Sequence, residues 1–174
     1  YTPDQPDLFA RLCAFLGRHN YSIADAKIYT TRHGYALDTF HVFLPEHHEG
    51  NYRDLINFVE FELAATLLRQ DPISLPAKGR LNRHQKNFPV KPQVLIRPDD
   101  KGRHFVLSIV AGDNQGLLAR IAKVLSGYQV SVDSAKIMTL GGRVEDSFLL
   151  SSPRLSDDKA LLALEADLIE ALRV

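Results

Sequence analysis

The chain has 174 residues, of which 45% are hydrophobic and 24% charged, with 21 basic and 21 acidic side chains. A formal net charge of zero excludes a general electrostatic attraction to nucleic acid or to an anionic membrane, so partners must be inferred from local sites. No apolar run approaches the roughly 18 residues that span a bilayer, and no signal sequence opens the chain, which predicts a cytoplasmic protein.

The first predicted element is a helix that follows a polar turn at residues 4–8. Asp4 can accept hydrogen bonds from free N–H groups at the helix start, and Pro6 suits the first turn because it has no N–H to lose. Cys13 falls among the apolar positions, which favours a small buried side chain over a reactive thiol. The helical stripe consists of Leu8, Leu12, Phe15, Leu16 and His19.

Two strands are predicted next, over residues 21–32 and 34–44, joined through a turn at Gly34. Side chains alternate along a strand, so each strand presents one face of small or apolar residues to the helices. On the first strand this face holds Ala24, Ala26 and Ile28, and on the second it holds Ala36, Asp38, Phe40 and Val42.

A second helix and a long connection complete the first half of the chain. Proline and glycine interrupt residues 71–93, which predicts a basic linker. Val94, Leu95 and Ile96 look like a strand that closes the first unit, and the turn after it leads into a strand at residues 105–111, so this hairpin is expected to join two sheets. The helix stripe consists of Leu55, Ile56, Val59, Leu63 and Leu67.

The second half of the chain repeats the first at an offset of about 109 residues. Residues 4–12 match 113–121, residues 22–30 match 131–139, and after a slip of one residue 37–40 match 145–148. A last helix has its stripe at Leu161, Leu164, Leu168 and Leu172.

Two copies at this spacing are too few and too long for a solenoid, so each is expected to be a small domain. The element order predicts an α+β chain of two tandem ferredoxin-like (βαββαβ) domains, at residues 1–98 and 103–174. We expect the first to lack part of its first strand, the second to lack its last strand, and the whole to be a fragment of a longer protein.

Catalysis has little support in the sequence. No nucleophile elbow, zinc-protease, phosphate-loop or paired-cysteine motif is present. His47, His48 and Glu49 favour a solvated loop over a metal site, because no further ligand cluster is in register. An RNA-binding sheet is disfavoured, because Leu37 and Asp38 stand where the recognition signature needs Phe and Val. The basic residues that raise the RNA alternative are Lys78, Arg80, Arg83, His84, Lys86 and Lys91.

The repeated turn is the predicted ligand site. A helix N-terminus suits a small carboxylate, and nearby oxygens can take an ammonium group, which together favour a free amino acid. The alternative is that Asp4 and Asp113 only cap their helices. Gln5, Asn114 and Gln115 add polar groups that a simple cap does not require.

These motifs resemble a known family. Residues 113–122 read Asp-x-x-Gly-Leu-Leu-Ala-Arg-Ile-Ala, followed by Ser-x-x-x-Ala-Lys-Ile-x-Thr and then Glu-Asp-x-Phe, which resembles the ACT domain, a small-molecule sensor. More closely, residues 1–10 and 25–40 resemble the C-terminal tandem ACT domains of the bacterial bifunctional PII uridylyltransferase/uridylyl-removing enzymes. The resemblance covers nearly the whole chain.

The resemblance implies a regulatory module that binds glutamine. It would set whether an upstream nucleotidyltransferase domain adds UMP to the nitrogen-signalling protein PII or an upstream HD domain removes it. That family uses Mg and UTP, but we expect no cofactor, metal or catalytic residue in this chain. The expected ligand-binding residues are Asp113, Asn114, Gln115, Gly116, Leu117, Val132, Asp4, Gln5, Pro6, Asp7, Leu8 and Ile23.

Two departures from the family pattern matter for the site. The Pro-Gly pair of the family is split, with Pro6-Asp7 in the first turn and Gln115-Gly116 in the second. Because Asp7 repels a ligand carboxylate and glycine allows close backbone approach, the second turn is expected to bind the carboxylate better.

The alternative to a ligand sensor is a dimerisation or interaction module without a ligand. Incomplete sheets predict a homodimer in either case.

Overall fold

The computed structural model describes residues 1–44, 51–69, 72–76, 89–140 and 142–173. The linker segment 77–88, with most of its basic residues, and the His47-His48-Glu49 motif lie outside the described residues. The first repeat contains β1 (Thr2–Pro3), α1 (Leu8–Arg18), β2 (Ser22–Lys27), β3 (Tyr35–Ala36), β4 (Thr39–Phe43) and α2 (Tyr52–Arg69). The second part contains β5 (Gln93–Pro98), β6 (Phe105–Gly112), α4 (Leu117–Gly127), β7 (Ser131–Lys136), β8 (Thr139–Leu140), β9 (Arg143–Ser151), a 3-10 turn (Pro153–Ser156) and α5 (Asp158–Leu172).

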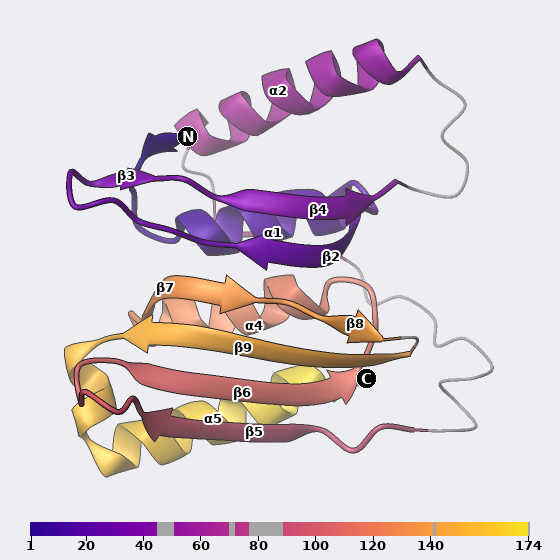
Figure 1. Ribbon diagram of the computed structural model, residues 1–174. Helices are drawn as coiled ribbons and strands as arrows, with labels where there is room; N and C mark the ends of the chain where they lie inside the picture. Colours follow the sequence, from indigo (N-terminus) through magenta and orange to yellow (C-terminus); the bar gives the residue numbers. More distant parts are fainter. Residues whose placement is uncertain (45–50, 70–71, 77–88, 141, 174) are drawn as a thin grey trace.

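The structure is an α+β chain with antiparallel sheets, as the element order predicted. Strands β5, β6, β9 and β7 are hydrogen-bonded in that order, and β8 pairs with β9. In the first repeat β2 pairs with β4, and the short strand β1 pairs with β3. Helices α1, α4 and α5 lie behind the strands in Figure 1, whereas α2 lies beyond the edge formed by β4.

Strand β5 differs from the sequence-based expectation. It was expected to close the first unit, but it pairs with β6 along its whole length, from Gln93 opposite Val110 to Pro98 opposite Phe105. The short turn between β5 and β6 explains this pairing, because closing a short loop costs little conformational entropy. The carboxylate of Asp99 fixes that turn by accepting hydrogen bonds from the backbone N–H groups of Arg103 and His104, at 2.8 and 3.0 Å.

The pairing of β5 completes the second sheet. It lies on the outer side of β6, the place that the last strand of a βαββαβ unit occupies, and α5 packs against it. The N–H of Ile96 donates to the Glu165 carboxylate of α5 at 2.9 Å. The last strand expected to be missing is therefore replaced by one that precedes the repeat, while the domain boundary itself remains a prediction.

The strands of the first repeat are shorter than the predicted spans of 21–32 and 34–44. An aspartate side chain interrupts the ladder, since Asp38 Oδ1 accepts from the N–H of Tyr29 at 3.4 Å. The same break recurs in the second repeat, where Asp146 Oδ1 accepts from Met138 N–H at 3.2 Å. The turn at Gly34 is confirmed, with a φ of 73° that favours glycine.

The two repeats pack side by side through equivalent elements. Helix α1 contacts α4, and β2 lies next to β7 (Figure 1). Both strands carry a register shift at the same place, between Ile23 and Asp25 and between Val132 and Ser134. Contact between equivalent elements is what an approximate two-fold relation produces.

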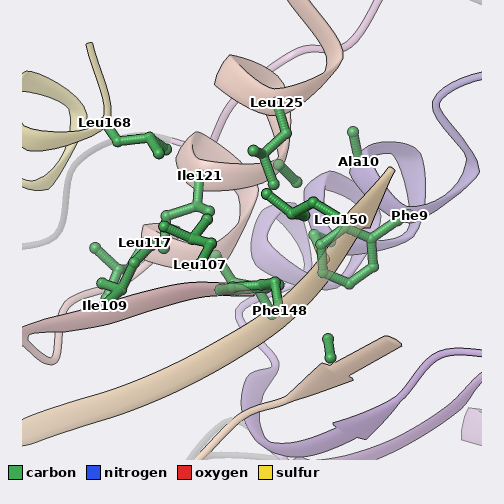
Figure 2. Close-up of a cluster of buried hydrophobic side chains, with 14 of the residues drawn as sticks. Phe9, Ala10, Leu107, Ile109, Leu117, Ile121, Leu125, Phe148, Leu150 and Leu168 are labelled. Carbon is green, nitrogen blue, oxygen red and sulfur yellow. The ribbon is translucent and has the colours of Figure 1, made fainter. Parts of the chain in front are cut away.

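The hydrophobic core spans both repeats. Phe9 of α1 meets Phe148 of β9 edge to face, with ring centroids 6.2 Å apart, and Figure 2 shows both beside Leu150 and Ile121. Cys13 is 1% exposed, so its predicted burial is confirmed, and burial raises the pKa of its thiol. The first repeat is therefore stabilised largely by its packing on the second.

Candidate functional site

A cavity of about 700 Å³ lies between the two repeats. The first repeat contributes its polar turn and the start of α1, and the second contributes the end of α4 and the start of β7. Its lining residues are Asp4, Gln5, Pro6, Asp7, Leu8, Phe9, Ala10, Ile28, Thr30, Ala36, Asp38, Ala122, Leu125, Ser126, Gln129, Val130, Ser131, Val132, Asp133 and Ser151. This volume suits a small-molecule ligand.

The polar turn has a fixed backbone geometry. The N–H of Asp4 donates to the carbonyl of Gly34 at 2.8 Å, and the N–H of Leu8 donates to that of Gln5 at 3.2 Å. The residue that caps α1 is Asp7, in the left-handed region with a φ of 62°, and its side chain makes no capping hydrogen bond. Asp4 therefore lies one turn before the helix cap and does not occupy the cap position itself.

The second turn repeats this backbone closely. The N–H of Asp113 donates to Gly142 at 2.9 Å and that of Leu117 to Asn114 at 3.1 Å. Gly116 caps α4 with a φ of 74°. The duplication seen in the sequence is thus a duplication of the turn conformation, with glycine in one copy and aspartate in the other.

The cavity is acidic. Four aspartates line it, and no lysine, arginine or histidine occurs among the described residues of its wall. Burial raises the pKa of Asp38, against the hydrogen bond from Tyr29, and the nearby charge of Asp4 raises it further. Such a wall favours a ligand with an ammonium group and disfavours one with net negative charge. The four are Asp4, Asp7, Asp38 and Asp133.

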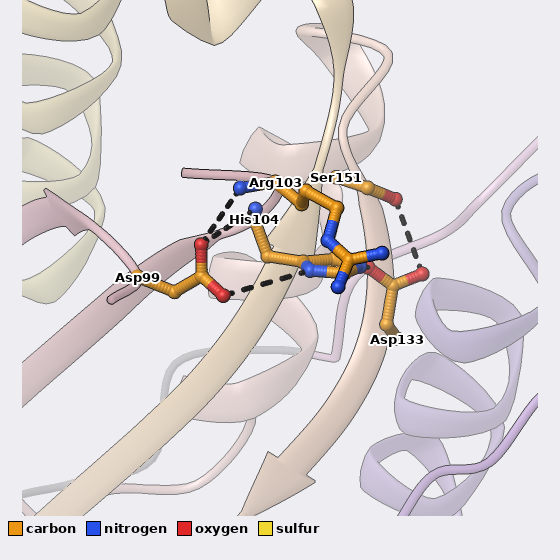
Figure 3. A network of polar contacts seen from close by, with 5 residues as sticks. All are labelled: Asp99, Arg103, His104, Asp133 and Ser151. Atoms are coloured by element: carbon orange, nitrogen blue, oxygen red, sulfur yellow. Dashed lines mark hydrogen bonds and ion pairs between the residues drawn. The ribbon is translucent and has the colours of Figure 1, made fainter. Parts of the chain in front are cut away.

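Asp133 has an incompletely satisfied carboxylate, which Figure 3 shows with its neighbours. Its Oδ1 accepts from the Ser151 hydroxyl at 3.1 Å. Its Oδ2 is buried and has no hydrogen-bond partner, and Nε2 of His104 lies 3.9 Å from it. A buried acceptor without a partner is costly. The Asp133 side chain as a whole is 33% exposed and lines the cavity, so the negative charge of its carboxylate can attract a cationic group of a ligand there.

Sequence reasoning did not single out Asp133. Its equivalent at the 109-residue offset is Ala24, so a search for residues shared by both copies passes over it. Asp133 is also the residue skipped in the register shift of β7. A bulge re-aims a side chain, and only the paired strands reveal it.

The structure brings only part of the predicted site together. The first-turn residues and Val132 line the cavity. The second-turn residues and Ile23 do not line it; Ile23 packs, partly buried, against the core. Whether either turn binds a ligand remains a prediction. The residues that line it are Asp4, Gln5, Pro6, Asp7 and Leu8, and those that do not are Asp113, Asn114, Gln115, Gly116 and Leu117.

The second turn is closed by side-chain contacts of its own. Gln115 donates through Nε2 to Asn20 Oδ1 of the first repeat. Arg120, which is buried, donates to the side chain of Asn114, to the carbonyl of Gln115 at 3.0 Å and to the carbonyl of Ala171 at 3.0 Å. These bonds tie the turn to α5 and to the other repeat.

Behind the second turn lies a buried carboxyl, Asp146, with 3% of its surface exposed. Burial raises its pKa from 3.8 to about 7, and the charge of Asp113 raises it too, although the Met138 N–H opposes the shift. Burial also raises the pKa of Asp113. Burial therefore disfavours the charged form of both carboxyl groups, Asp113 and Asp146.

Among the residues that the structure describes, no group of three or more histidine, cysteine, aspartate or glutamate side chains is placed to hold a metal ion. Over the same part of the chain, no helix combines the length and the hydropathy of a membrane span. Of the basic linker residues, Lys91 alone is described, and it is exposed.

Comparison with known proteins identifies similar sequences along the whole chain. It is 70% identical over 174 residues to the bifunctional uridylyltransferase/uridylyl-removing enzyme of Chromobacterium violaceum. It is 51% and 50% identical to the enzymes of that name from Ralstonia nicotianae and Cupriavidus pinatubonensis, again over all of its length. The chain spans about a fifth of each relative, 20%, 21% and 20%. No protein-family model matches it.

Proposed function

We infer, because the whole chain is homologous to about one fifth of the bifunctional uridylyltransferase/uridylyl-removing enzymes, that it is a regulatory part of such an enzyme. It senses glutamine and controls, in the cytoplasm, whether catalytic domains elsewhere in the enzyme add UMP to the PII protein or remove it. The observation that carries this proposal is the acidic cavity between the repeats, which the polar turn of one repeat and β7 of the other form together.

The cavity supports an amino-acid ligand through two features, one from each repeat. The start of α1 offers the positive end of a helix dipole to the ligand carboxylate. Asp133 offers the negative charge of its partly exposed carboxylate to the ligand ammonium. Because the two walls belong to different repeats, a ligand that contacts both would stabilise their packing, which is a physical route from occupancy to regulation.

Glutamine fits this wall better than glutamate does. A second carboxylate on the ligand would enter a space lined by four aspartates without a described basic residue. A neutral amide avoids this repulsion and can pair with polar side chains such as Ser126 and Gln129 at the second-repeat wall.

Calorimetry and thermal shift with both amino acids test the proposal. We expect millimolar glutamine to raise the melting temperature and glutamate to raise it much less. Asp133→Asn should weaken glutamine binding by roughly 10-fold or more, since hydrogen bonds to charged groups contribute about 1.5–3 kcal/mol. Asp100→Asn, exposed and outside the cavity, is the matched control. A folded chain without a response to glutamine would contradict the sensor function.

A second candidate function is self-association or docking without a ligand. Helix α2 buries none of its residues, and it exposes large apolar side chains, among them Phe61 at 71% and Leu68 at 84%. An exposed apolar surface of this kind marks interaction sites. If this is the function, light scattering at high micromolar concentration should show a homodimer. A strict monomer that binds glutamine would contradict self-association and leave glutamine sensing as the remaining function.

A further inference from the structure

The approximate two-fold relation of the repeats implies a second cavity equivalent to the open one. At the 109-residue offset, the wall positions in the first turn and around the end of α4 have counterparts in the second turn and around the end of α1, and α1 and α4 are in contact. The open cavity is lined by Pro6, Asp7, Ser126 and Gln129, whose counterparts are Gln115, Gly116, Gly17 and Asn20.

The counterpart space is filled by a proline of the linker. A Cβ atom built on Gly17 would lie 2.9 Å from Cγ of Pro76, and one built on Gly116 would lie closer still. Real Cβ contacts are not that short, so both glycines are needed for the ring to fit between α1 and the start of α4. Pro76 is half-buried, and Ile73 and Leu75 beside it pack on the core, which holds the ring in place.

Two further differences separate the closed side from the open one. On the closed side Gln115 bridges to Asn20 by a hydrogen bond between side chains. On the open side the counterpart of Gln115 is Pro6, which has no side-chain donor for such a bridge with Gln129. Of the two equivalent spaces, one is therefore open and the other is filled by Pro76 and bridged by Gln115 and Asn20.

We propose that Pro76 is the resident occupant of a second amino-acid site, so that the chain binds one ligand where its duplicated architecture provides two places. The ligand class rests on the proposed function, whereas the seating of Pro76 does not. The segment 72–76 thereby competes with any carboxylate that approaches the start of α4.

The packing of Pro76 against Gly17 is tested by a double-mutant cycle that measures the melting temperature. In a Pro76→Gly background, Gly17→Ala should raise the melting temperature by roughly 2–4 °C, because alanine favours a helix and the ring is gone. In the parent, the same change should fail to raise it. Gly127→Ala, at the end of α4 with open space around it, is the control and should act alike in both backgrounds. Equal effects of Gly17→Ala in the two backgrounds would overturn the proposal.

Ligand count is tested by calorimetry with glutamine. The parent should bind one glutamine per chain and Pro76→Gly two, and one site in both proteins would overturn the second site. A parent that binds none would refute the proposed function instead, and the melting-temperature cycle would still show whether Pro76 fills the space.

Discussion

The two repeats share a backbone plan but differ in what they bury. Helix α5 of the second part has Leu164, Leu168 and Leu172 fully or almost fully buried, whereas α2 buries no residue. The second repeat also receives β5 as an additional strand. A duplicated unit has thus become a well-packed body on one side and a more exposed unit on the other, with the open cavity formed by residues of both.

The strongest challenge to this comparison is a core truncation in each half. Leu168→Ala removes a side chain with no exposed surface, and we expect a loss of about 2–5 kcal/mol in the free energy of unfolding. Leu63→Ala, on the partly buried side of α2, should cost clearly less. Denaturant unfolding measures both. Equal losses would show that the first repeat is as well packed as the second.

The equivalent aspartates of the two repeats provide a pH test. Burial raises the pKa of Asp146 to about 7 from 3.8, so its protonated form is favoured in the folded state. Stability from this group is fully present below pH 3.8 and is lost as pH rises through 7, by at most about 4 kcal/mol. Asp146→Asn should therefore be more stable than the parent at pH 8 and lose most of this pH dependence.

The first-repeat counterpart is the control for that measurement. Burial also raises the pKa of Asp38, but this group is less buried, so Asp38→Asn should give a smaller gain at pH 8. Unfolding curves between pH 5 and 8 compare the two variants. A larger gain from Asp38→Asn would reverse the assignment of the more tightly packed repeat.

Much of the fold follows from local sequence signals. The stripe beginning at Leu8, its copy beginning at Leu117, and the leucines of the last helix predicted α1, α4 and α5, because helical periodicity depends on near neighbours. The partner of β5 could not be predicted in this way. Strand pairing depends on long-range geometry, and the same apolar run at Val94 suits either sheet.

The site was predictable only where the two copies agree. Repetition identified both turns, but it gave no indication that Pro76 fills one of the spaces, since that proline has no counterpart in the motif. It also passed over Asp133, which has no acidic equivalent in the first copy. Contacts between segments far apart in the chain decide both features, and no local pattern encodes them.

An exchange of the two cap residues tests the asymmetry of the turns directly. Gly116→Asp places a side chain at a φ of 74° and against Pro76, so we expect a loss of about 1–3 kcal/mol from overpacking and strain. Glutamine affinity should change little as long as the protein is folded, because Gly116 is outside the open cavity. Chemical denaturation and calorimetry on the same sample separate the two effects. A large loss of affinity at unchanged stability would place the ligand at the second turn.

The reverse exchange, Asp7→Gly, should have the smallest effect on stability and the opposite sign. Asp7 is a non-glycine residue at a φ of 62°, and relief of that strain should stabilise the fold by about 0.5–1 kcal/mol. The same substitution at Asp54, in the first turn of α2, should instead destabilise by about 1 kcal/mol, because glycine is unfavourable in a regular helix. Asp7 lines the open cavity, so its removal also takes a negative charge from the start of α1 and should strengthen glutamine binding. Weaker binding by Asp7→Gly would mean that this carboxylate holds the ligand ammonium, which would move the ammonium from Asp133 to the first turn.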